Sequence, residues 1–359
     1  MTATGVGLDS QGVLDAVLSM PEQMAESLEA ASGLDGLPDR AAIENVVVLG
    51  MGGSAAAGDV LVASAGAFLP VPVTVIRSYQ VPAFVGEGSL VFAISFSGDT
   101  EETIEAVTES ALAGAKVVAV TALGGELARL ADSWEVPLVR VGGGIPQPRA
   151  ALGALAVPPL VVLEDMGLFP GARSWIESAI EQLKIRRDQL LKPGNPAEAM
   201  ARAIGRTIPL IYGGGPLGAA AAYRWKTDLN ENAKVPAFWN TQPELCHNEL
   251  SGWGQHGDVT RQVITLVGLR HDFEHPQVMQ RFDLTYQVLD EVVAGIEELC
   301  AEGEGELAQL LDLILVGGVT AIDLALQEGV DPGPIPVQED IKRALATTAG
   351  DGTPEGIRP

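Results

Sequence analysis

The sequence has very few cysteines, since Cys246 and Cys300 are the only two among 359 residues. Two cysteines cannot build the disulfide framework on which small secreted domains depend, and their separation leaves no Cys-x-x-Cys pair for a metal. Histidines number four, and His256, His271 and His275 show no metal-ligand spacing with a third ligand in reach. The composition therefore excludes a disulfide-rich fold, and we expect no metal site.

Positive charge is also scarce. Lysine and arginine number 22 against 47 aspartates and glutamates, which gives a net charge of −25. So acidic a surface repels phosphate backbones and anionic lipid, and we expect neither a nucleic acid nor a membrane surface as a partner. An anionic ligand would have to be captured locally, by helix ends or by a few placed cations.

Long hydrophobic runs are missing as well. The apolar stretches are broken by Gly, Pro or a charge before about 18 residues, so we expect no membrane-spanning helix. Residues 1–7 carry no basic segment that leads into an apolar one, so no secretory signal is visible. These features predict a soluble protein of the cytoplasm.

Hydrophobic residues nevertheless make up 47% of a chain that is longer than one core usually organises, so two domains are expected. Residues 1–40 form a predicted amphipathic arm, with Val13, Val17, Met20 and Met24 at helical spacing. From residue 45, short β-branched runs that do not alternate with polar residues are separated by Ala-rich helical stretches, which is typical of a parallel sheet covered on both faces. The predicted strands are 46–49, 73–76, 90–94, 117–120 and 138–141, and the predicted helices are 54–65, 100–113 and 126–132.

A second α/β unit follows a stretch, 155–191, that reads as helices alone. Its predicted strands are 208–212, 237–239 and 263–267, and its predicted helices are 217–230, 276–298, 307–328 and 337–346. Both units open with a strand, a glycine turn and an Ala-rich helix, which indicates a duplicated α/β unit. We therefore predict an α/β protein with an N-terminal helical arm (1–40), a first subdomain (41–154), a helical connector (155–200), a second subdomain with the C-terminal helix (201–346) and a flexible tail (347–359).

The first glycine turn, Gly50-Met-Gly-Gly-Ser54, follows a strand and opens a helix. Glycines let a ligand approach the backbone, and the free N–H groups at the helix start favour an anion. A dinucleotide loop would need Gly-x-Gly-x-x-Gly and an acidic residue at the end of the second strand, but that strand ends in Ile76-Arg77-Ser78-Tyr79. A ligand-binding loop and a plain tight turn both stay open, and we favour the former.

Hydroxyl groups cluster in Ser95-Phe-Ser97-Gly-Asp-Thr100, where the third strand ends and a helix begins. Three hydroxyls and the N–H groups of the helix start can surround phosphate oxygens without any cation. The alternative is an ordinary helix cap by Asp99 or Thr100, with the two glutamates that follow complementing the helix dipole. We favour the phosphate site, because three hydroxyls exceed what one cap needs. The matching loop of the second unit, 268–275, has no such cluster, so one site per chain is expected.

Four further segments hold polar residues in apolar company, namely Pro146–Arg149, Asn230–Lys234, Glu244–Glu249 and the helix around Lys342. Taken singly, each has a plain structural explanation as a solvated helix end, a capped turn or a surface lysine. Taken in order with the two loops, they resemble the bifunctional phosphoglucose/phosphomannose isomerases of the sugar isomerase (SIS) superfamily, over about residues 40–346. The Ser-x-Ser-Gly-x-Thr loop is shared by all SIS proteins, whereas its combination with Asn-Glu-Asn and Glu-Leu-x-His-Asn-Glu is much more specific.

The resemblance implies two flavodoxin-like parallel-sheet SIS subdomains and an aldose–ketose isomerase that uses no cofactor and no metal. Its substrate would be a hexose 6-phosphate, with fructose 6-phosphate interconverted with glucose 6-phosphate, mannose 6-phosphate or both through a cis-enediol. The resemblance assigns Glu231 as the base, Arg149 as the group that stabilises the enediolate, and His247 and Lys342 as the ring-opening pair. In the same way Gly52, Gly53 and Ser54 would border the sugar, and Ser95, Ser97 and Thr100 would hold its phosphate.

The resemblance also implies a homodimer with shared active sites, in which His247 serves the neighbouring subunit. The sequence departs from the family at one point, because the threonine that leaves room at C2 has no counterpart in Asp331–Asp340. The preference between glucose and mannose is therefore open. Two other functions are alternatives: a non-catalytic sugar-phosphate sensor, against which Glu231, Arg149 and His247 together argue, and an SIS isomerase of another sugar phosphate.

Overall fold

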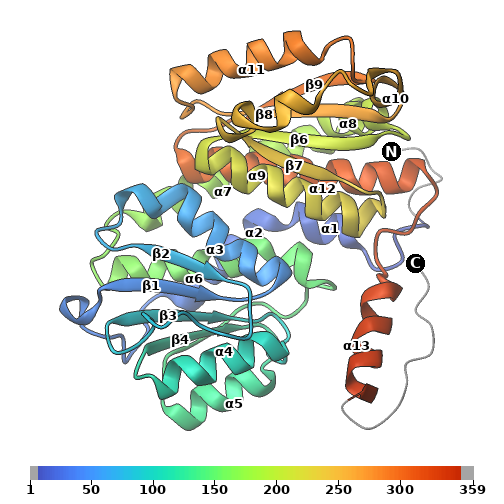
Figure 1. The fold of residues 1–359 in the computed structure, drawn as a ribbon. Coiled ribbons are helices and arrows are strands. Elements are labelled where there is room, and N and C mark those ends of the chain that lie inside the picture. Colours follow the sequence, from blue (N-terminus) through green and yellow to red (C-terminus); the bar gives the residue numbers. More distant parts are fainter. Residues whose placement is uncertain (1–6, 349–359) are drawn as a thin grey trace.

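Five apolar runs of the first half become one parallel sheet in the computed structural model, which describes residues 7–348 (Figure 1). The strands lie in the order β2-β1-β3-β4-β5, which is a flavodoxin-like order. Strands β1 and β3 are buried almost throughout because helices cover both faces of the sheet. The elements are β1 (Asn45–Leu49), α3 (Gly52–Ala65), β2 (Val73–Ile76), β3 (Ser89–Ile94), α4 (Glu101–Leu112), β4 (Lys116–Thr121), α5 (Gly125–Trp134) and β5 (Leu138–Arg140).

The second half repeats this arrangement with one strand fewer. Its four strands are parallel and lie in the order β7-β6-β8-β9, so the prediction of two parallel-sheet α/β units is confirmed. The elements are β6 (Ile208–Gly214), α9 (Gly215–Asp228), β7 (Phe238–Gln242), α10 (Gly257–Val263), β8 (Ile264–Arg270), α11 (Pro276–Leu289) and β9 (Gly295–Cys300).

The helix predicted over 276–298 is wrong in its second part, because α11 ends at Leu289 and β9 follows. Strand β9 lies at the edge of its sheet and keeps one side accessible, so it tolerates adjacent glutamates that a central strand would exclude. Glu298 is exposed there, forms an ion pair with Arg270 at 2.9 Å and accepts a hydrogen bond from the Tyr286 hydroxyl at 3.0 Å. These partners come from the fold and are not visible as a local pattern.

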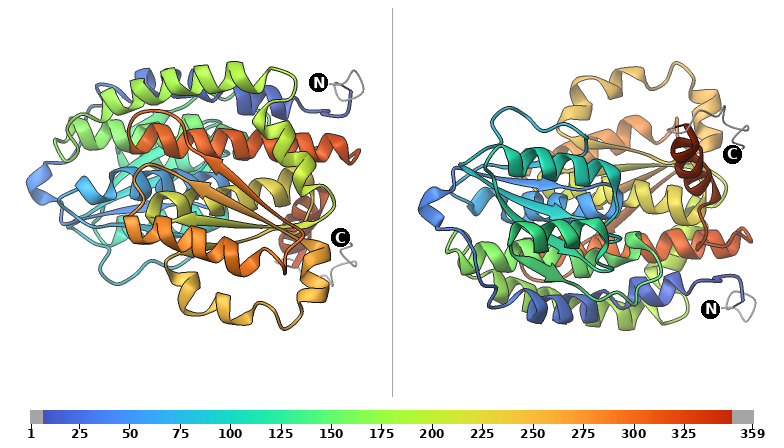
Figure 2. Two further views of the ribbon diagram at one scale, coloured as in Figure 1. Left: turned by 90° about the horizontal axis from the view of Figure 1, so that it is seen from above. Right: turned by 90° about the horizontal axis from the view of Figure 1, so that it is seen from below.

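The predicted N-terminal arm is two helices, α1 (Val13–Leu18) and α2 (Met20–Ala31), which meet at Ser19. The four apolar residues at helical spacing are all buried, as their spacing predicts. Both helices pack on a layer formed by α6 (Leu152–Asp165), α7 (Ala172–Leu190), α8 (Pro196–Ile204) and α12 (Glu306–Gln327). Both views in Figure 2 show α2, α7 and α12 along one face of the molecule, so this layer joins the two sheets.

Helix α12 is the centre of this layer. Among residues 7–348 it is the one helix that is long and apolar enough to cross a membrane by length and composition, and 94% of its apolar window is buried inside the protein. A helix that is packed on all sides is expected to be apolar all round, so its burial accounts for its composition.

A buried ion pair fastens α12 to α7. Arg186 donates from Nε and Nη2 to the two carboxylate oxygens of Asp312, each at 2.7 Å, and the side chains are 3% and 0% exposed. The same carboxylate accepts hydrogen bonds from the Gln182 side chain at 3.1 Å and from the Glu302 backbone N–H at 2.9 Å. Every oxygen of Asp312 therefore has a partner inside the protein.

The last described helix, α13 (Pro336–Thr348), stands clear of both sheets on the side where the strands of the first sheet end (Figure 1). The predicted division places β1 to β5 inside 41–154 and β6 to β9 inside 201–346, but its limits at 154, 200 and 346 fall within α6, α8 and α13. The division stays a prediction. Of the predicted tail, residues 349–359 lie outside the described residues.

Candidate active site

The hydroxyl loop lies between β3 and α4, at the carboxyl end of the first sheet. The Ser95 hydroxyl lies 2.9 Å from that of Thr100 and accepts a hydrogen bond from the Gly98 N–H at 3.0 Å, while the Ser97 hydroxyl accepts from the Asp99 N–H at 3.2 Å. Thr100 is the N-cap residue of α4, yet its side chain makes no capping hydrogen bond. The first N–H groups of this helix thus keep no side-chain acceptor, which favours an anion there.

Asp99, which the helix-cap alternative placed on α4, contacts another helix. Its carboxylate accepts a hydrogen bond from the Glu126 N–H at 2.8 Å, in the first turn of α5. The loop and that turn touch closely, because a Cβ atom on Gly98, which has a φ of +81°, would lie 1.9 Å from the Gly124 carbonyl oxygen. This contact holds the loop against the first turn of α5.

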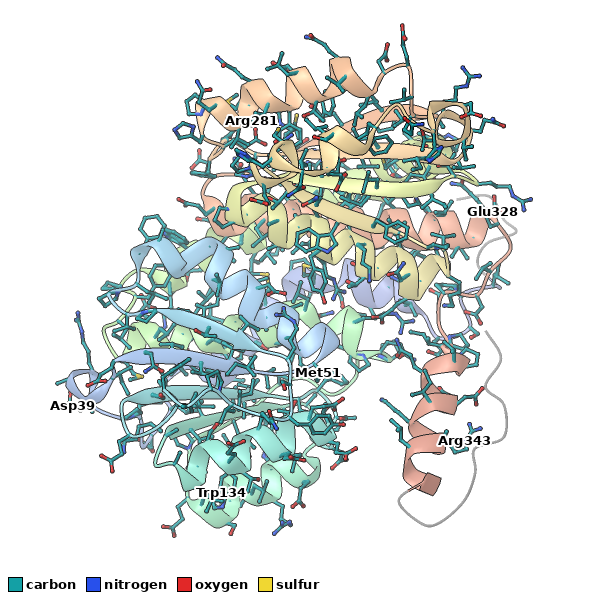
Figure 3. The ribbon with its side chains drawn as sticks, in the orientation of Figure 1. Asp39, Met51, Trp134, Arg281, Glu328 and Arg343 are labelled. Carbon is teal, nitrogen blue, oxygen red and sulfur yellow. The ribbon has the colours of Figure 1, made fainter. Side chains whose placement is uncertain are left out.

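The first glycine turn links the hydroxyl loop to Arg149. The Ser54 hydroxyl accepts a hydrogen bond from the Phe96 N–H at 3.3 Å. A Cβ atom on Gly53 would lie 2.9 Å from the Pro148 carbonyl oxygen and 3.2 Å from Cα of Arg149, so only glycine allows this approach. Gly52 is exposed and has a φ of +50° at the start of α3. Figure 3 labels the neighbouring Met51, which marks the end of the first sheet on the side that faces α13.

Arg149 lies in the short helix η3 (Pro148–Ala151) and is buried. Its Nε donates to Asn232 Oδ1 at 2.6 Å, Nη1 to Gln147 Oε1 at 3.1 Å, and Nη2 to the carbonyls of Pro332 and Gly333, both at 2.7 Å. Burial lowers the pKa of Arg149, against the attraction of Glu231. These four hydrogen bonds fix the orientation of the guanidinium.

Glu231 lies in η4 (Leu229–Ala233), a π-helical turn that continues α9. One of its carboxylate oxygens is 4.0 Å from Arg149 Nε, and its side chain is 25% exposed. That distance is too long for a hydrogen bond but short enough for charge attraction. The predicted base and the predicted enediolate-stabilising group therefore lie side by side, with the base accessible to a ligand.

Lys234 is a site residue that the sequence analysis did not single out. Its backbone is left-handed, with a φ of 57°, and its Nζ donates to the carbonyls of Glu231 at 2.7 Å, Asn232 at 3.3 Å and Pro332 at 3.0 Å. Desolvation lowers the pKa of Lys234 to about 8, and the positive charge of Arg149 contributes. The only sequence signal was its position three residues after Glu231, because its acceptors are backbone groups.

The structure does not bring the other two predicted catalytic residues to this cluster. His247 is exposed at the end of η5 (Glu244–His247), and Lys342 is exposed on α13. Within residues 7–348, neither side chain makes a hydrogen bond or ion pair with Arg149 or Glu231. Figure 3 shows the side chains of α13, with Arg343 labelled, on a helix set apart from the first sheet.

The matching loop of the second half contains an acid of its own. Glu274 is buried and accepts a hydrogen bond from the His271 N–H at 3.2 Å, and its carboxylate carbon would lie 3.4 Å from a Cβ atom on Gly214. Arg270 pairs with the same carboxylate at 2.9 Å. This carboxylate takes up the loop N–H group that a phosphate would need, which supports one phosphate site per chain. Among residues 7–348 no group of three His, Cys, Asp or Glu side chains could hold a metal ion.

Two family models match the chain. Residues 41–134 match the SIS domain, and residues 194–345 match the bacterial phospho-glucose isomerase C-terminal SIS domain. The first match covers strands of the first sheet, and the second covers the second sheet.

Two relatives match most of the chain. It is 32% identical over 342 residues to a bifunctional phosphoglucose/phosphomannose isomerase of Caldicellulosiruptor bescii, with 93% of this chain and 99% of that protein covered. It is also 32% identical to the protein of that name from Thermoplasma acidophilum, with 84% and 90% covered. Among solved structures, tagatose-6-phosphate ketose/aldose isomerase from Escherichia coli has a TM-score of 0.69 at 15% identity, with 90% of this chain and 95% of that chain covered, which is a likeness of fold.

Proposed function

Because the chain belongs to the bifunctional phosphoglucose/phosphomannose isomerase family, a group of phosphosugar aldose–ketose isomerases, we propose that it interconverts fructose 6-phosphate with glucose 6-phosphate, mannose 6-phosphate or both. The observation that carries this proposal is the Glu231 carboxylate 4.0 Å from the buried Arg149 guanidinium. Contacts through Gly53 and Ser54 connect this pair to the hydroxyl loop.

The reaction moves one proton between C1 and C2 and needs no change of oxidation state overall. Glu231 takes the proton from C2 of the open-chain aldose and returns it to C1, and the proton of the C2 hydroxyl is transferred to the C1 oxygen, so that the cis-enediol forms and collapses to the ketose. The positive charge of Arg149 stabilises the oxyanion that develops on the enediolate. Ser95, Ser97 and Thr100 hold the phosphate at the other end of the substrate and so fix the distance of C1 and C2 from Glu231.

The proposal is tested by a coupled assay of the purified protein with fructose, glucose and mannose 6-phosphates, with and without EDTA. We expect turnover of fructose 6-phosphate to at least one aldose 6-phosphate, at the same rate in EDTA. The absent threonine in Asp331–Asp340 makes the ratio of the two aldose products the informative number. No turnover of any of the three would overturn the proposal and favour a sugar-phosphate sensor.

Removing two hydroxyls from the loop tests the phosphate site. We expect the double variant Ser97→Ala, Thr100→Ala to raise KM by at least about 100-fold, because two hydrogen bonds to a dianion are each worth roughly 1.5–3 kcal/mol. The control is Ser174→Ala, which removes an exposed hydroxyl on α7 that donates to Gly171. A double variant with KM within twofold of wild type would show that the loop only starts a helix.

Assembly completes the proposed site. The protein forms a two-fold dimer in which His247 of one chain reaches the Glu231 of the other, and α13 with Lys342 packs against the assembled site. The exposed side chain of His247 supports this arrangement, as do Phe238 and Trp239, apolar side chains 59% and 38% exposed on the strand that leads to it.

Mixing two inactive variants, Glu231→Gln and His247→Ala, under conditions that exchange subunits tests the shared site. Random pairing gives half mixed dimers, each with one intact site and one doubly defective site, so activity should return to roughly a quarter of wild type. The control mixes Glu231→Gln with Arg149→Lys, which lie in the same chain and should not complement. No recovery in the first mixture, with exchange verified by mass spectrometry, would refute the shared site.

The proposed location and partners of the enzyme are supported by its thiols and its charge. A cytoplasmic location suits a sugar-phosphate isomerase, and the free thiols of Cys246 and Cys300 support it. The net charge of −25 supports the absence of nucleic-acid and membrane-surface partners.

A further inference from the structure

Arg149 differs from the other buried arginines in its hydrogen-bond acceptors. Within residues 7–348, three arginines are buried: Arg149, Arg186 and Arg224. Arg186 has Asp312 as a bidentate partner, and Arg224 has Asp228, with its Nε 3.0 Å and Nη2 2.8 Å from the two carboxylate oxygens. Buried arginines are expected to pair in this way. Arg149 makes no hydrogen bond to a carboxylate.

All four acceptors around Arg149 are neutral oxygens. They are the side-chain amides of Asn232 and Gln147 and the backbone carbonyls of Pro332 and Gly333. A guanidinium has five N–H donors, so this set leaves one N–H on Nη1 without an acceptor among the described residues. The guanidinium is thus oriented by neutral groups, and the carboxylate that pairs with it, that of Glu231, lies 4.0 Å away without a hydrogen bond.

Asn232 is the acceptor that most needs an explanation. It is 0% exposed, and its Oδ1 makes the shortest hydrogen bond of the set, at 2.6 Å. Its Nδ2 is buried and has no acceptor among residues 7–348, which is unfavourable. An aspartate would have nearly the same shape, would accept the same hydrogen bond and would bury no unpaired donor. The hydrogen bonds around this position would therefore be satisfied better by aspartate, but the sequence has asparagine.

A carboxylate at this position would change the chemistry next to Glu231. It would neutralise Arg149 at short range in a poorly solvated place, where charges interact strongly. The developing enediolate would then meet a compensated arginine, and the base would meet a second negative charge. The buried Asp228, which could also compete for Arg149, is instead occupied by Arg224, and Arg224 donates to the Arg149 backbone carbonyl as well.

We propose that Asn232 is a positioning residue, which fixes the guanidinium of Arg149 with a neutral acceptor so that its charge, hydrogen-bonded to no carboxylate, faces the enediolate. This inference rests on the proposed isomerase function and adds Asn232 to the groups on which catalysis depends. It acts through Arg149 and takes no part in proton transfer itself.

Two variants separate the charge from the hydrogen bond. Asn232→Asp keeps an acceptor for Arg149 Nε and adds a negative charge, whereas Asn232→Ala removes the acceptor. We expect kcat to fall by at least about tenfold in both, with KM changed by less than about threefold, because the lost stabilisation acts in the transition state. A purely structural role predicts instead that Asn232→Asp is as active as wild type.

The matched control is Asn195→Asp, the same exchange of an amide for a carboxylate at another buried asparagine. Asn195 caps α8 by accepting hydrogen bonds from the N–H groups of Ala197 and Glu198, which aspartate also does. Its amide donates to the carbonyls of Leu190 and Lys192 as well, so this control loses two hydrogen bonds and tests whether lost stability alone lowers activity. Its kcat should equal that of wild type.

Calorimetric binding gives a readout that does not depend on turnover. A phosphorylated five-carbon sugar hydroxamate carries negative charge where the enediolate would, and sorbitol 6-phosphate is uncharged there. Both Asn232 variants should lose at least about tenfold affinity for the hydroxamate and less than about threefold for sorbitol 6-phosphate. Thermal melting of each variant establishes that it is folded. If Asn232→Asp does not fold, the affinities and kcat of Asn232→Ala provide the test.

The outcomes are distinct. If the wild type is active and the folded Asn232→Asp variant keeps its kcat within twofold, the role of Asn232 is overturned and the isomerase function stands. The same holds if the folded variant loses affinity for the hydroxamate and for sorbitol 6-phosphate to the same extent. A wild type that neither turns over nor binds any of the hexose 6-phosphates overturns the proposed function, and the role of Asn232 with it.

Discussion

Replacing Glu231 by glutamine is expected to lower kcat by about 10²–10⁴-fold while KM changes little, because a positioned base contributes on that order to the rate. Glutamine keeps the shape of the side chain and its contact distance to Arg149, but it cannot accept the proton from C2. The side chain is 25% exposed and lies in a turn held by Lys234, so the substitution should not disturb the fold.

The decisive measurement is exchange of the C2 proton with solvent deuterium, followed by NMR on glucose 6-phosphate in the presence of the enzyme. Exchange should disappear in Glu231→Gln, while fructose 6-phosphate still binds in calorimetry. The control is Glu181→Gln, on the exposed face of α7, which should exchange and turn over as wild type does. Exchange that persists in Glu231→Gln would assign the base to another residue.

Replacing Asp312 by alanine is expected to lower the free energy of unfolding by about 3 kcal/mol, since it removes the bidentate, fully buried partner of Arg186 and leaves only the half-exposed Glu302 carboxylate, 2.9 Å from Nη1. Gln182 and the Glu302 N–H lose an acceptor in the same variant. The effect should be large because both charged side chains are almost completely buried between α7 and α12.

Urea unfolding followed by circular dichroism measures this change. Glu181→Ala breaks an exposed ion pair with Lys184 on the same helix α7, and it should leave the unfolding midpoint unchanged. Adding Arg186→Met to Asp312→Ala should recover part of the loss, because the unpaired charge is then removed. A loss below about 1 kcal/mol in Asp312→Ala would mean that Glu302 and water replace the lost carboxylate beside Arg186.

Most strands and helices could be predicted from the sequence, because an element that is buried on all sides is a continuous apolar run. Strand β3 and helix α12 are such elements, and both lie close to their predicted limits. Strand β9 was missed because an edge strand may carry charges, so its pattern does not distinguish it from a helix. The break at Ser19 was also missed, since the apolar spacing continues across it.

The candidate site divides in the same way. Loops with unusual local composition, such as Ser95–Thr100, could be recognised, and the proximity of Glu231 to Arg149 came from the family resemblance. Lys234 and the acceptors at Pro332 and Gly333 could not be predicted, because backbone carbonyls leave no mark in the sequence. The roles of His247 and Lys342 stay predictions, since their partners would come from assembly.

The contact between Arg149 and the turn before α13 bears on how this protein is synthesised. Nη2 of Arg149 donates to Pro332 and Gly333, which lie 183 and 184 residues further along the chain. A ribosome has therefore translated the whole first sheet, the hydroxyl loop and Glu231 well before it makes the carbonyl oxygens that orient the arginine. A chain released before Pro332 would carry Glu231 and Arg149 without the two carbonyl acceptors that orient the guanidinium, so the proposed site is completed late in translation.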